Sequence, residues 1–365
     1  MSGWTKGGAR DGTRGEAGRG EDDDGPDERS PPLSRETSAL FGHGAAEQEF
    51  LAAYRSGRIP HAWLIGGEVG IGKATLAYRM ARFVLAHPDP ARADVTAATS
   101  LAVDPTHPTA RRVAGNAHTD LLILERTPGD SGKLRTVITV DQVRRLTSFF
   151  GSTAGEGGWR VCVVDSANEL KYPEASNALL KMLEEPPARS LFLVVSHAPG
   201  RLLPTIRSRC RRLALKPLGQ GDVVRAASTA LGVDGADPAV VKAAAGARGS
   251  VARAIALSGG PVLALREKVA ALLAALPATD PVALHALGDQ LDRGDRDLLE
   301  VFVGAVRDFL SSRLDSEAKD LASLARTADL WDRLNRQARD VETYNLERRP
   351  LVFATFGLLA EANGG

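Results

Sequence analysis

The stretch that decides the fold is GEVGIGKAT, residues 67–75. It meets the phosphate-loop pattern G-x-x-x-x-G-K-[S/T] at Gly67, Gly72 and Lys73. It departs from that pattern at Ala74, where a Ser or Thr hydroxyl normally holds magnesium. Because a methyl group cannot coordinate a hard cation, the stretch predicts a phosphate-binding loop with impaired metal chemistry.

The residues around the loop supply the context that phosphate binding requires. An apolar strand is expected at residues 62–65 and a helix at residues 73–85, so the loop amides, including that of Gly70, would face phosphate at a helix start. Thr75 carries a hydroxyl one residue late, about 100° further round the helix, and does not replace the missing group. The alternative is a tight glycine turn that happens to precede a lysine.

A second motif is VCVVD at residues 161–165, an apolar strand ending in a carboxylate. In working phosphate-loop enzymes an Asp at this place helps to hold magnesium, so Asp165 is a candidate for that role. The glutamate that often follows it and activates water is replaced by Ser166, and the nearest acid is Glu169. The alternative reading of Asp165 is a helix cap or a turn residue.

A third motif combines a strand end with an arginine. Ser196 ends an apolar run beside the expected phosphate position, where a small polar residue could sense a γ-phosphate. Arg209 follows the segment LPTIRS, residues 203–208, near the expected edge of the domain. A guanidinium can contact phosphate at two points without losing its charge, so Arg209 is a candidate arginine finger for a neighbouring subunit. The alternative is a surface ion pair.

Apolar runs and amphipathic segments alternate along the first part of the chain, which predicts a parallel sheet covered by helices on both faces. After residue 217 the strand pattern disappears, and we expect only helices, with a break at residues 259–261. Further strands are expected at residues 121–124, 159–164 and 190–195, and further helices at residues 45–56, 141–150 (capped by Asp141) and 173–185.

Composition limits the remaining possibilities. The net charge of +1 gives no global basic field, so any contact with nucleic acid must be local or shared with partners. Residues 1–36 are glycine-rich and charged, which predicts a disordered tail, with a partner-binding arm as the alternative. Residues 87–118 lack periodicity and are expected to form an irregular insertion. No apolar run is long enough to span a membrane and no secretory signal is visible, so we expect a cytoplasmic protein.

Taken together, these motifs resemble the AAA+ clamp-loader family of bacterial DNA polymerase III. The resemblance spans most of residues 40–216, with one further match in the helical part. Its segments are RIPHAWL (58–64), GIGKATLA (70–77), ITVDQVRRL (138–146), NALLKMLEEPP (177–187), SRC (208–210) and GSVARA (249–254).

The resemblance implies a RecA-like AAA+ core at residues 37–217, a helical lid at 218–260 and a helical collar for oligomerisation at 261–365. It also implies a stator, largely without hydrolysis of its own, within the DNA polymerase III holoenzyme, a DNA-directed DNA polymerase and nucleotidyltransferase. Its expected partners are the gamma/tau and delta subunits of a five-membered ring. Through that complex it would meet the sliding clamp and primer-template DNA during replication, with Arg209 serving the ATP site of an adjacent motor.

Two departures from the family pattern bear on cofactors. Many members carry a four-cysteine zinc module, but this chain has only Cys162 and Cys210, so we expect no zinc or other metal. The lid signature usually reads Gly-Ser-x-Arg, whereas here Ala252 takes the arginine position and Arg253 follows one residue later. No cofactor is required, although the remaining loop allows weak binding of ATP or ADP.

Two other functions remain open on the sequence. An ATP-hydrolysing gamma/tau-type motor would need a hydroxyl at position 74, an acid at position 166 and an arginine at position 252, and the chain has none of the three. A non-replicative AAA+ scaffold would keep the fold without the ring, and Arg209 would then have no effect in trans.

Overall fold

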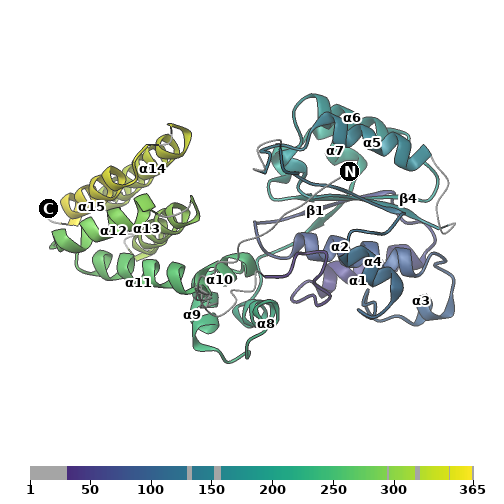
Figure 1. The fold of residues 1–365 in the computed structure, drawn as a ribbon, viewed down its shortest axis with the longest axis horizontal. Helices are drawn as coiled ribbons and strands as arrows, with labels where there is room; N and C mark the ends of the chain where they lie inside the picture. The colour runs from purple at the N-terminus through teal and green to yellow at the C-terminus, as the bar shows by residue number, and fades with distance from the viewer. Residues whose placement is uncertain are drawn as a thin grey trace, which may run out of the picture. The chain divides into compact units, whose positions relative to one another are not determined.

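The computed structural model describes residues 31–129, 134–151, 158–293, 296–316, 321–344 and 346–363. The first part of the chain is built on a parallel five-stranded sheet with the strand order β2-β3-β4-β1-β5 (Figure 1). The strands are β1 (Ala62–Gly66), β2 (Leu121–Leu124), β3 (Arg160–Val164), β4 (Ser190–Ser196) and β5 (Arg211–Ala214).

Helices cover both faces of this sheet, as the sequence predicted, and each face has its own apolar core. One face packs against α1 (Gly44–Arg55), α2 (Lys73–Ala86), α3 (Ala93–Ala97) and α4 (Pro108–Ala114). The other packs against α5 (Val140–Gly151), α6 (Glu174–Glu184) and α7 (Pro204–Arg209).

Burial explains which strands the sequence could predict. Every residue of β1, β3 and β4 is buried, and strands buried on both faces read as continuous apolar runs. The sequence analysis did not predict β5, which pairs only with β1 and has Leu213 as its one buried residue. Its sequence RRLA lacks an apolar run because an edge strand keeps most of its side chains exposed.

Helix α5 begins differently from the prediction. Asp141 was expected to cap it, but the helix starts at Val140 and Asp141 lies in its exposed first turn, 3.3 Å from Arg144. Thr139 and Gln142 form the cap instead. The side-chain oxygen of Gln142 accepts from the backbone amide of Thr139 at 2.9 Å, and the Thr139 hydroxyl accepts from the backbone amide of Gln142 at 3.4 Å. This reciprocal pair has the form of a capping box.

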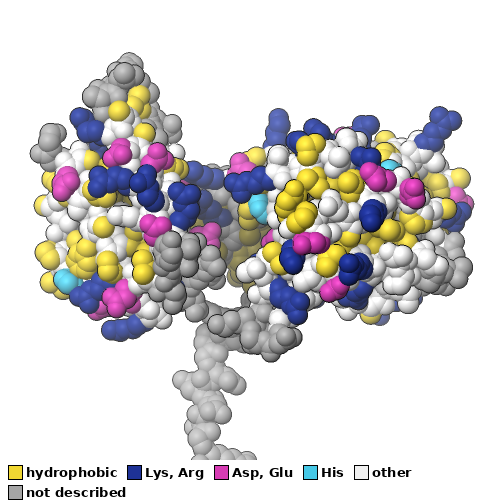
Figure 2. Space-filling view, turned by 90° about the horizontal axis from the view of Figure 1, so that it is seen from above, with side chains coloured by type: hydrophobic (Ala, Val, Ile, Leu, Met, Phe, Trp, Pro, Cys, Tyr) yellow, Lys and Arg dark blue, Asp and Glu magenta, His cyan; other side chains and the backbone are white. Residues whose placement is uncertain are grey.

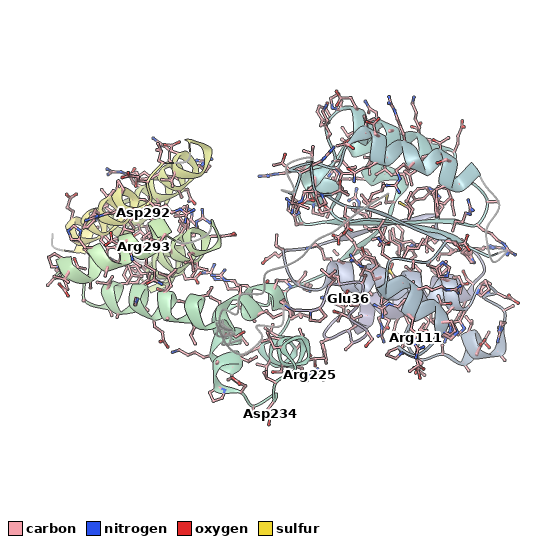
Figure 3. All side chains as sticks on the ribbon, viewed as in Figure 1. Glu36, Arg111, Arg225, Asp234, Asp292 and Arg293 are labelled. Atoms are coloured by element: carbon pink, nitrogen blue, oxygen red, sulfur yellow. The ribbon has the colours of Figure 1, made fainter. Side chains whose placement is uncertain are left out.

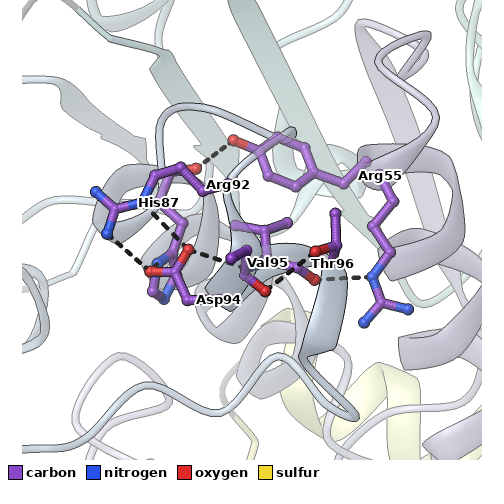
Figure 4. A network of polar contacts seen from close by, with 8 residues as sticks. Arg55, His87, Arg92, Asp94, Val95 and Thr96 are labelled. Carbon is purple, nitrogen blue, oxygen red and sulfur yellow. Dashed lines mark hydrogen bonds and ion pairs between the residues drawn. The ribbon is translucent and has the colours of Figure 1, made fainter.

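The expected irregular insertion at residues 87–118 contains two short helices, α3 and α4, so that prediction was wrong in part. Polar contacts hold α3 in place (Figure 4). The guanidinium of Arg55 donates to the carbonyl of Val95 at 2.9 Å, and Asp94 pairs with Arg92 at 3.0 Å and with His87 at 3.4 Å. Such short helices carry too few turns for a periodic signal in the sequence.

The predicted disordered tail falls mostly outside the described residues, since residues 1–30 are not among them. Its last part, residues 31–36, contains a turn in which the Glu36 amide donates to the carbonyl of Leu33 at 2.8 Å. Just beyond it, Arg79 donates to the carbonyl of Ser38 at 2.5 Å. The Arg79 contact ties the start of the described chain to α2.

Beyond residue 217 every described element is a helix, as predicted. Helices α8 (Gln220–Leu231), α9 (Pro238–Gly246) and α10 (Val251–Ser258) share one small core. A second helical core is formed by α11 (Gly260–Ala274), α12 (Pro281–Arg293), α13 (Arg296–Ser316), α14 (Leu321–Tyr344) and α15 (Arg349–Asn363).

Asp292, labelled in Figure 3, connects two helices of that second core. It lies near the end of α12, and its carboxylate accepts from the amides of Arg348 at 2.6 Å and Arg349 at 3.2 Å, where α15 begins. A carboxylate at a helix start satisfies free amides and matches the helix dipole. None of the helices described is both long and apolar enough to cross a membrane.

Candidate functional site

The predicted phosphate loop lies between β1 and α2, at the edge of the sheet where the strands end, here called the carboxyl edge. Gly67, Gly70 and Gly72 have φ values of 153°, 76° and 95°, which side chains of L-residues rarely allow. Gly72 precedes the first residue of α2, Lys73. The loop therefore has the strand–loop–helix arrangement that presents amides to an anion.

Two of these glycines also make room for the chain itself. A Cβ on Gly67 would lie 2.6 Å from the carbonyl oxygen of Leu215, and one on Gly70 would lie 2.3 Å from Oγ of Ser250. The Gly70 carbonyl accepts from the amides of Val251 at 2.8 Å and Ala252 at 3.2 Å, at the start of α10. The loop is thus a contact site for α10 as well as a candidate phosphate cradle.

Lys73 is turned into its own loop. Its side chain is buried, and its ammonium group donates to the carbonyl of Glu68. Burial lowers the pKa of Lys73, and the charges of Asp165 and Glu68 oppose that effect. Ala74, the departure from the pattern, packs against the apolar core beside the loop. Its methyl group therefore contributes to packing at a position where a magnesium ligand was expected.

Asp165 follows β3 at the same carboxyl edge, and its surroundings disfavour its charge. Burial, the largest cause, together with the charges of Glu125 and Glu169 raises the pKa of Asp165 to about 6, and Lys73 opposes them. Glu169, the nearest acid after Asp165 in the sequence, pairs with Arg126 at 2.9 Å. The carboxyl edge thus holds several acids around one buried lysine.

Ser196 ends β4 directly beside the loop, because it pairs with Gly66 and its carbonyl accepts from the Gly67 amide at 3.3 Å. Its hydroxyl donates to the side-chain oxygen of Asn168 at 2.7 Å. That oxygen also accepts from the amide of His197 at 3.0 Å. Sequence analysis missed Asn168, because a lone polar residue in a turn carries no pattern.

His43 is a second residue that sequence analysis missed. Its side chain is buried before α1, and Nε2 lies 2.6 Å from the carbonyl oxygen of Ile71 in the loop. Because a carbonyl oxygen can only accept, Nε2 carries the proton and donates to the loop backbone. Only the fold brings residue 43 to residue 71, so no local pattern could have predicted the contact.

Arg253, which follows the expected lid position at Ala252, points to another partner. Its guanidinium pairs with Asp308 of α13 at 2.7 Å. Arg248 and Arg266 pair with the same carboxylate at 2.9 Å and 3.3 Å. Burial lowers the pKa of Arg266; Asp308 opposes this effect, and the two nearby arginines add to it. Arg253 therefore links α10, which belongs to the first helical core, to α13, which belongs to the second.

Arg209 lies at the opposite, amino edge of the sheet, where the strands begin. It is the last residue of α7 and comes just before β5, whose first residue pairs with Trp63 near the start of β1. The five residues of β1 span roughly 16 Å at about 3.3 Å per residue. An arginine side chain is shorter than that distance, so Arg209 does not reach the loop of its own chain.

In the isolated chain Arg209 forms the surface ion pair that was its alternative reading. Its Nη2 lies 2.7 Å from Oε1 of Glu184, and its Nη1 donates to the carbonyl of Thr205 at 3.1 Å. Both charged side chains are partly exposed, 35% for Arg209 and 40% for Glu184. The structure thus separates the candidate site residues into two groups, the loop residues at the carboxyl edge and Arg209 at the amino edge.

Metal binding finds no support in the side chains described. Across the described ranges no three His, Cys, Asp or Glu side chains are arranged to hold a metal ion. Cys162 and Cys210 are both buried and free, and burial raises the pKa of each thiol, so neither is readily ionised as a ligand. The absence of zinc stays a prediction.

The parallel sheet, the glycine loop after its β1 strand and the two helical bodies that follow define an AAA+ protein with a RecA-like core. Residues 42–219 match the model of the family described as "DNA polymerase III, delta subunit".

Known relatives agree with the family match. The DNA polymerase III subunit delta' of Pseudomonas aeruginosa is 39% identical over 150 residues, 41% of this chain and 41% of that protein. The delta' subunit of Escherichia coli K12 is 33% identical over 175 residues, 47% of this chain and 46% of that protein. The chain thus spans less than half the length of these curated relatives.

One solved structure extends over more of the chain. A gamma subunit-related protein of Thermotoga maritima aligns with 86% of this chain and 99% of its own, with a TM-score of 0.41 and 16% identity.

Proposed function

We propose that this protein is a delta'-type stator subunit of the DNA polymerase III clamp loader and supplies Arg209 to the ATP site of an adjacent motor subunit. In this role it helps ATP-driven loading of the sliding clamp onto primed DNA. Its partners are gamma/tau and delta subunits in a five-membered ring, within the DNA polymerase III holoenzyme. The match of residues 42–219 to the delta-subunit family model supports the role.

The observation that carries the trans assignment is the position of Arg209 at the amino edge of the sheet. A full strand length separates it from the loop that follows β1. An arginine finger acts by placing a guanidinium against the phosphates in the transition state. Since Arg209 cannot do so at its own loop, the only nucleotide within its reach is one that a neighbouring subunit holds.

In this proposal the chain's own loop hydrolyses ATP poorly. Ala74 offers no oxygen to magnesium, Ser166 offers no carboxylate to water, and Ala252 offers no guanidinium to nucleotide. Lys73 and the loop amides still provide phosphate contacts. The purified protein should therefore bind ATP or ADP weakly and hydrolyse ATP negligibly.

Contact with DNA belongs to the assembly in this proposal. The net charge of +1 gives the chain no basic field of its own. On the face shown in Figure 2, Lys and Arg side chains lie interspersed with Asp and Glu. Primer-template DNA would therefore be held by surfaces that several subunits share.

Reconstitution with gamma/tau and delta subunits tests the proposal. Arg209→Ala should leave ring assembly intact and slow DNA-dependent ATP hydrolysis, by ~10³–10⁵-fold at the site the finger serves. Arg211→Ala is the matched control, because Arg211 lies at the same edge and pairs with Glu49 at 2.7 Å. Unchanged hydrolysis in the Arg209 variant would refute the finger and favour a scaffold. Robust hydrolysis by the purified chain alone would favour the motor.

A further inference from the structure

We propose that Glu184 is a positioning residue for Arg209: its carboxylate keeps the guanidinium folded onto α6 until the phosphates of a neighbouring nucleotide displace it. This inference rests on the proposed function, because it assumes that Arg209 meets a nucleotide in trans. Glu184 would then weaken the neighbour's affinity for ATP by competing for the finger.

The geometry makes Glu184 the resting partner of the finger. Glu184 is the last residue of α6 and Arg209 the last residue of α7, and the two helices pack against each other. Nη2 of Arg209 pairs with Oε1 of Glu184 at 2.7 Å, and Nη1 of Arg209 donates to the carbonyl of Thr205 at 3.1 Å. The two contacts fix the guanidinium close to its own helices.

The end of α6 that carries Glu184 is itself held in place. Leu183, the residue before it, is 1% exposed and belongs to the core on that face of the sheet. The Leu183 carbonyl lies 3.1 Å from Nε2 of His61, directly before β1. Because both the side chain and the carbonyl of Leu183 are held, the Glu184 carboxylate is presented at a defined place on the amino edge.

The energetics allow the finger to change partners. Ion pairs between partly exposed side chains contribute only about 0–1 kcal/mol, and the side chains of this pair are 35% and 40% exposed. A triphosphate carries more negative charge than one carboxylate and can accept a guanidinium at two oxygens. Nucleotide therefore competes successfully with Glu184 for Arg209. The negative charge of Glu184 nevertheless weakens the binding of the nucleotide.

Glu184→Gln tests this competition because it removes the charge and keeps the size of the side chain. In the reconstituted complex we expect the KM for ATP to fall about twofold to fivefold, with kcat little changed. The difference in KM between the variant and the unmodified complex should become smaller at high ionic strength, because salt screens exposed charges. A purely structural role of Glu184 would not produce this split between KM and kcat.

Glu185→Gln is the matched control. It removes the same charge one residue later, at the end of the same helix, without touching the Arg209 contact. Any general effect of helix-end charge or of net charge should appear equally in this variant. We expect its KM for ATP to equal that of the unmodified complex.

The double variant Glu184→Gln with Arg209→Ala separates this inference from the proposed function. If Glu184 acts through Arg209, its effect on KM should vanish when the arginine is absent. Slow hydrolysis in Arg209→Ala together with an unchanged KM in Glu184→Gln would overturn the inference and leave the finger standing. Unchanged hydrolysis in Arg209→Ala would overturn the proposed function itself.

Discussion

The two edges of the central sheet differ in how their charged groups are satisfied. At the carboxyl edge, Lys73 is buried and donates within its own loop, and the Gly70 carbonyl accepts from α10. At the amino edge, Arg209 forms one partly exposed ion pair. The first edge is closed by contacts within the chain, while the second holds a charge that can change partners at little cost.

This difference teaches how a nucleotide fold can keep its motif while its function moves elsewhere. The loop glycines are required by the chain's own packing, because side chains on Gly67 and Gly70 would collide with Leu215 and Ser250. Their presence alone therefore does not demonstrate ATP turnover. The proposed contribution to catalysis lies at the edge that carries no nucleotide motif.

The largest expected effect is the loss of ATP hydrolysis when Arg209, at the amino edge, is changed. Arg209→Lys keeps the charge but loses the planar fork that contacts two phosphate oxygens. We expect the reconstituted complex to lose most of the roughly 10³- to 10⁵-fold acceleration that a finger supplies at its site. DNA-dependent ATPase assays measure it, with Arg211→Lys as the control. Full activity in the Lys variant would mean that only charge matters there.

The second effect concerns the acids of the carboxyl edge. Burial and the neighbouring acids Glu125 and Glu169 raise the pKa of Asp165 from 3.8 to about 6, a gap that corresponds to about 3 kcal/mol. Because the folded state holds this proton more tightly, the stabilisation is complete below about pH 4 and is lost as the pH rises through about 6.

Asp165→Asn should therefore flatten the pH dependence of stability between pH 4 and 7 and raise the free energy of unfolding at pH 8. Urea denaturation in the presence of a chelator measures both quantities. Asp141→Asn is the control, because the side chain of Asp141 is 82% exposed. A steeper profile in the Asp165→Asn variant than in the unmodified protein would contradict the electrostatic account.

The third effect tests whether the loop glycines serve the chain's own packing. Gly70 has a φ of 76°, and a Cβ there would lie 2.3 Å from Ser250 Oγ and 2.8 Å from Ala252 Cβ. Gly70→Ala should cost about 2–3 kcal/mol, from backbone strain plus the collision. Urea denaturation and hydrogen exchange in α10 would show it.

Gly57→Ala is the control for backbone strain alone, since Gly57 has a φ of 68° and open space around its Cβ position. It should cost about 1 kcal/mol. Equal costs at the two positions would show that contact between the loop and α10 contributes nothing to stability.

The smallest expected effect is at Lys73. Lys73→Ala should leave DNA-dependent hydrolysis by the reconstituted complex unchanged, because this chain's own loop does not turn over ATP in the proposed function. Weak nucleotide binding by the purified chain should disappear, since the ammonium is a main phosphate contact. A large loss of ATP hydrolysis by the complex would show that this chain's own loop takes part in hydrolysis. It would contradict the proposed difference between the two edges and favour the motor hypothesis.

Much of the core could be predicted because its signals are local. The buried strands appear as apolar runs, and the loop appears as glycines at fixed spacing. Strand β5 escaped prediction because only Leu213 is buried in it. The start of α5 was misplaced because Asp141 resembles a cap, whereas the cap that forms joins Thr139 and Gln142.

The contacts that position the candidate site were mostly invisible in the sequence. Asn168 and His43 bind backbone or side chains that lie far away along the chain. In the sequence Glu184 is one of two adjacent glutamates at the end of a predicted helix, and nothing there points to Arg209. Their importance arises from tertiary neighbours, and a single sequence records neighbours only when they lie within a few residues.

By itself the sequence determined the phosphate-loop fold and the three substitutions at Ala74, Ser166 and Ala252 that argue against hydrolysis. These are local facts of residue type and spacing. Only the tertiary structure decided that Arg209 lies a strand length from its own loop and rests on Glu184. The pairing of β5 with β1 places Arg209 at the edge where β1 begins, and no local pattern in the sequence records that pairing.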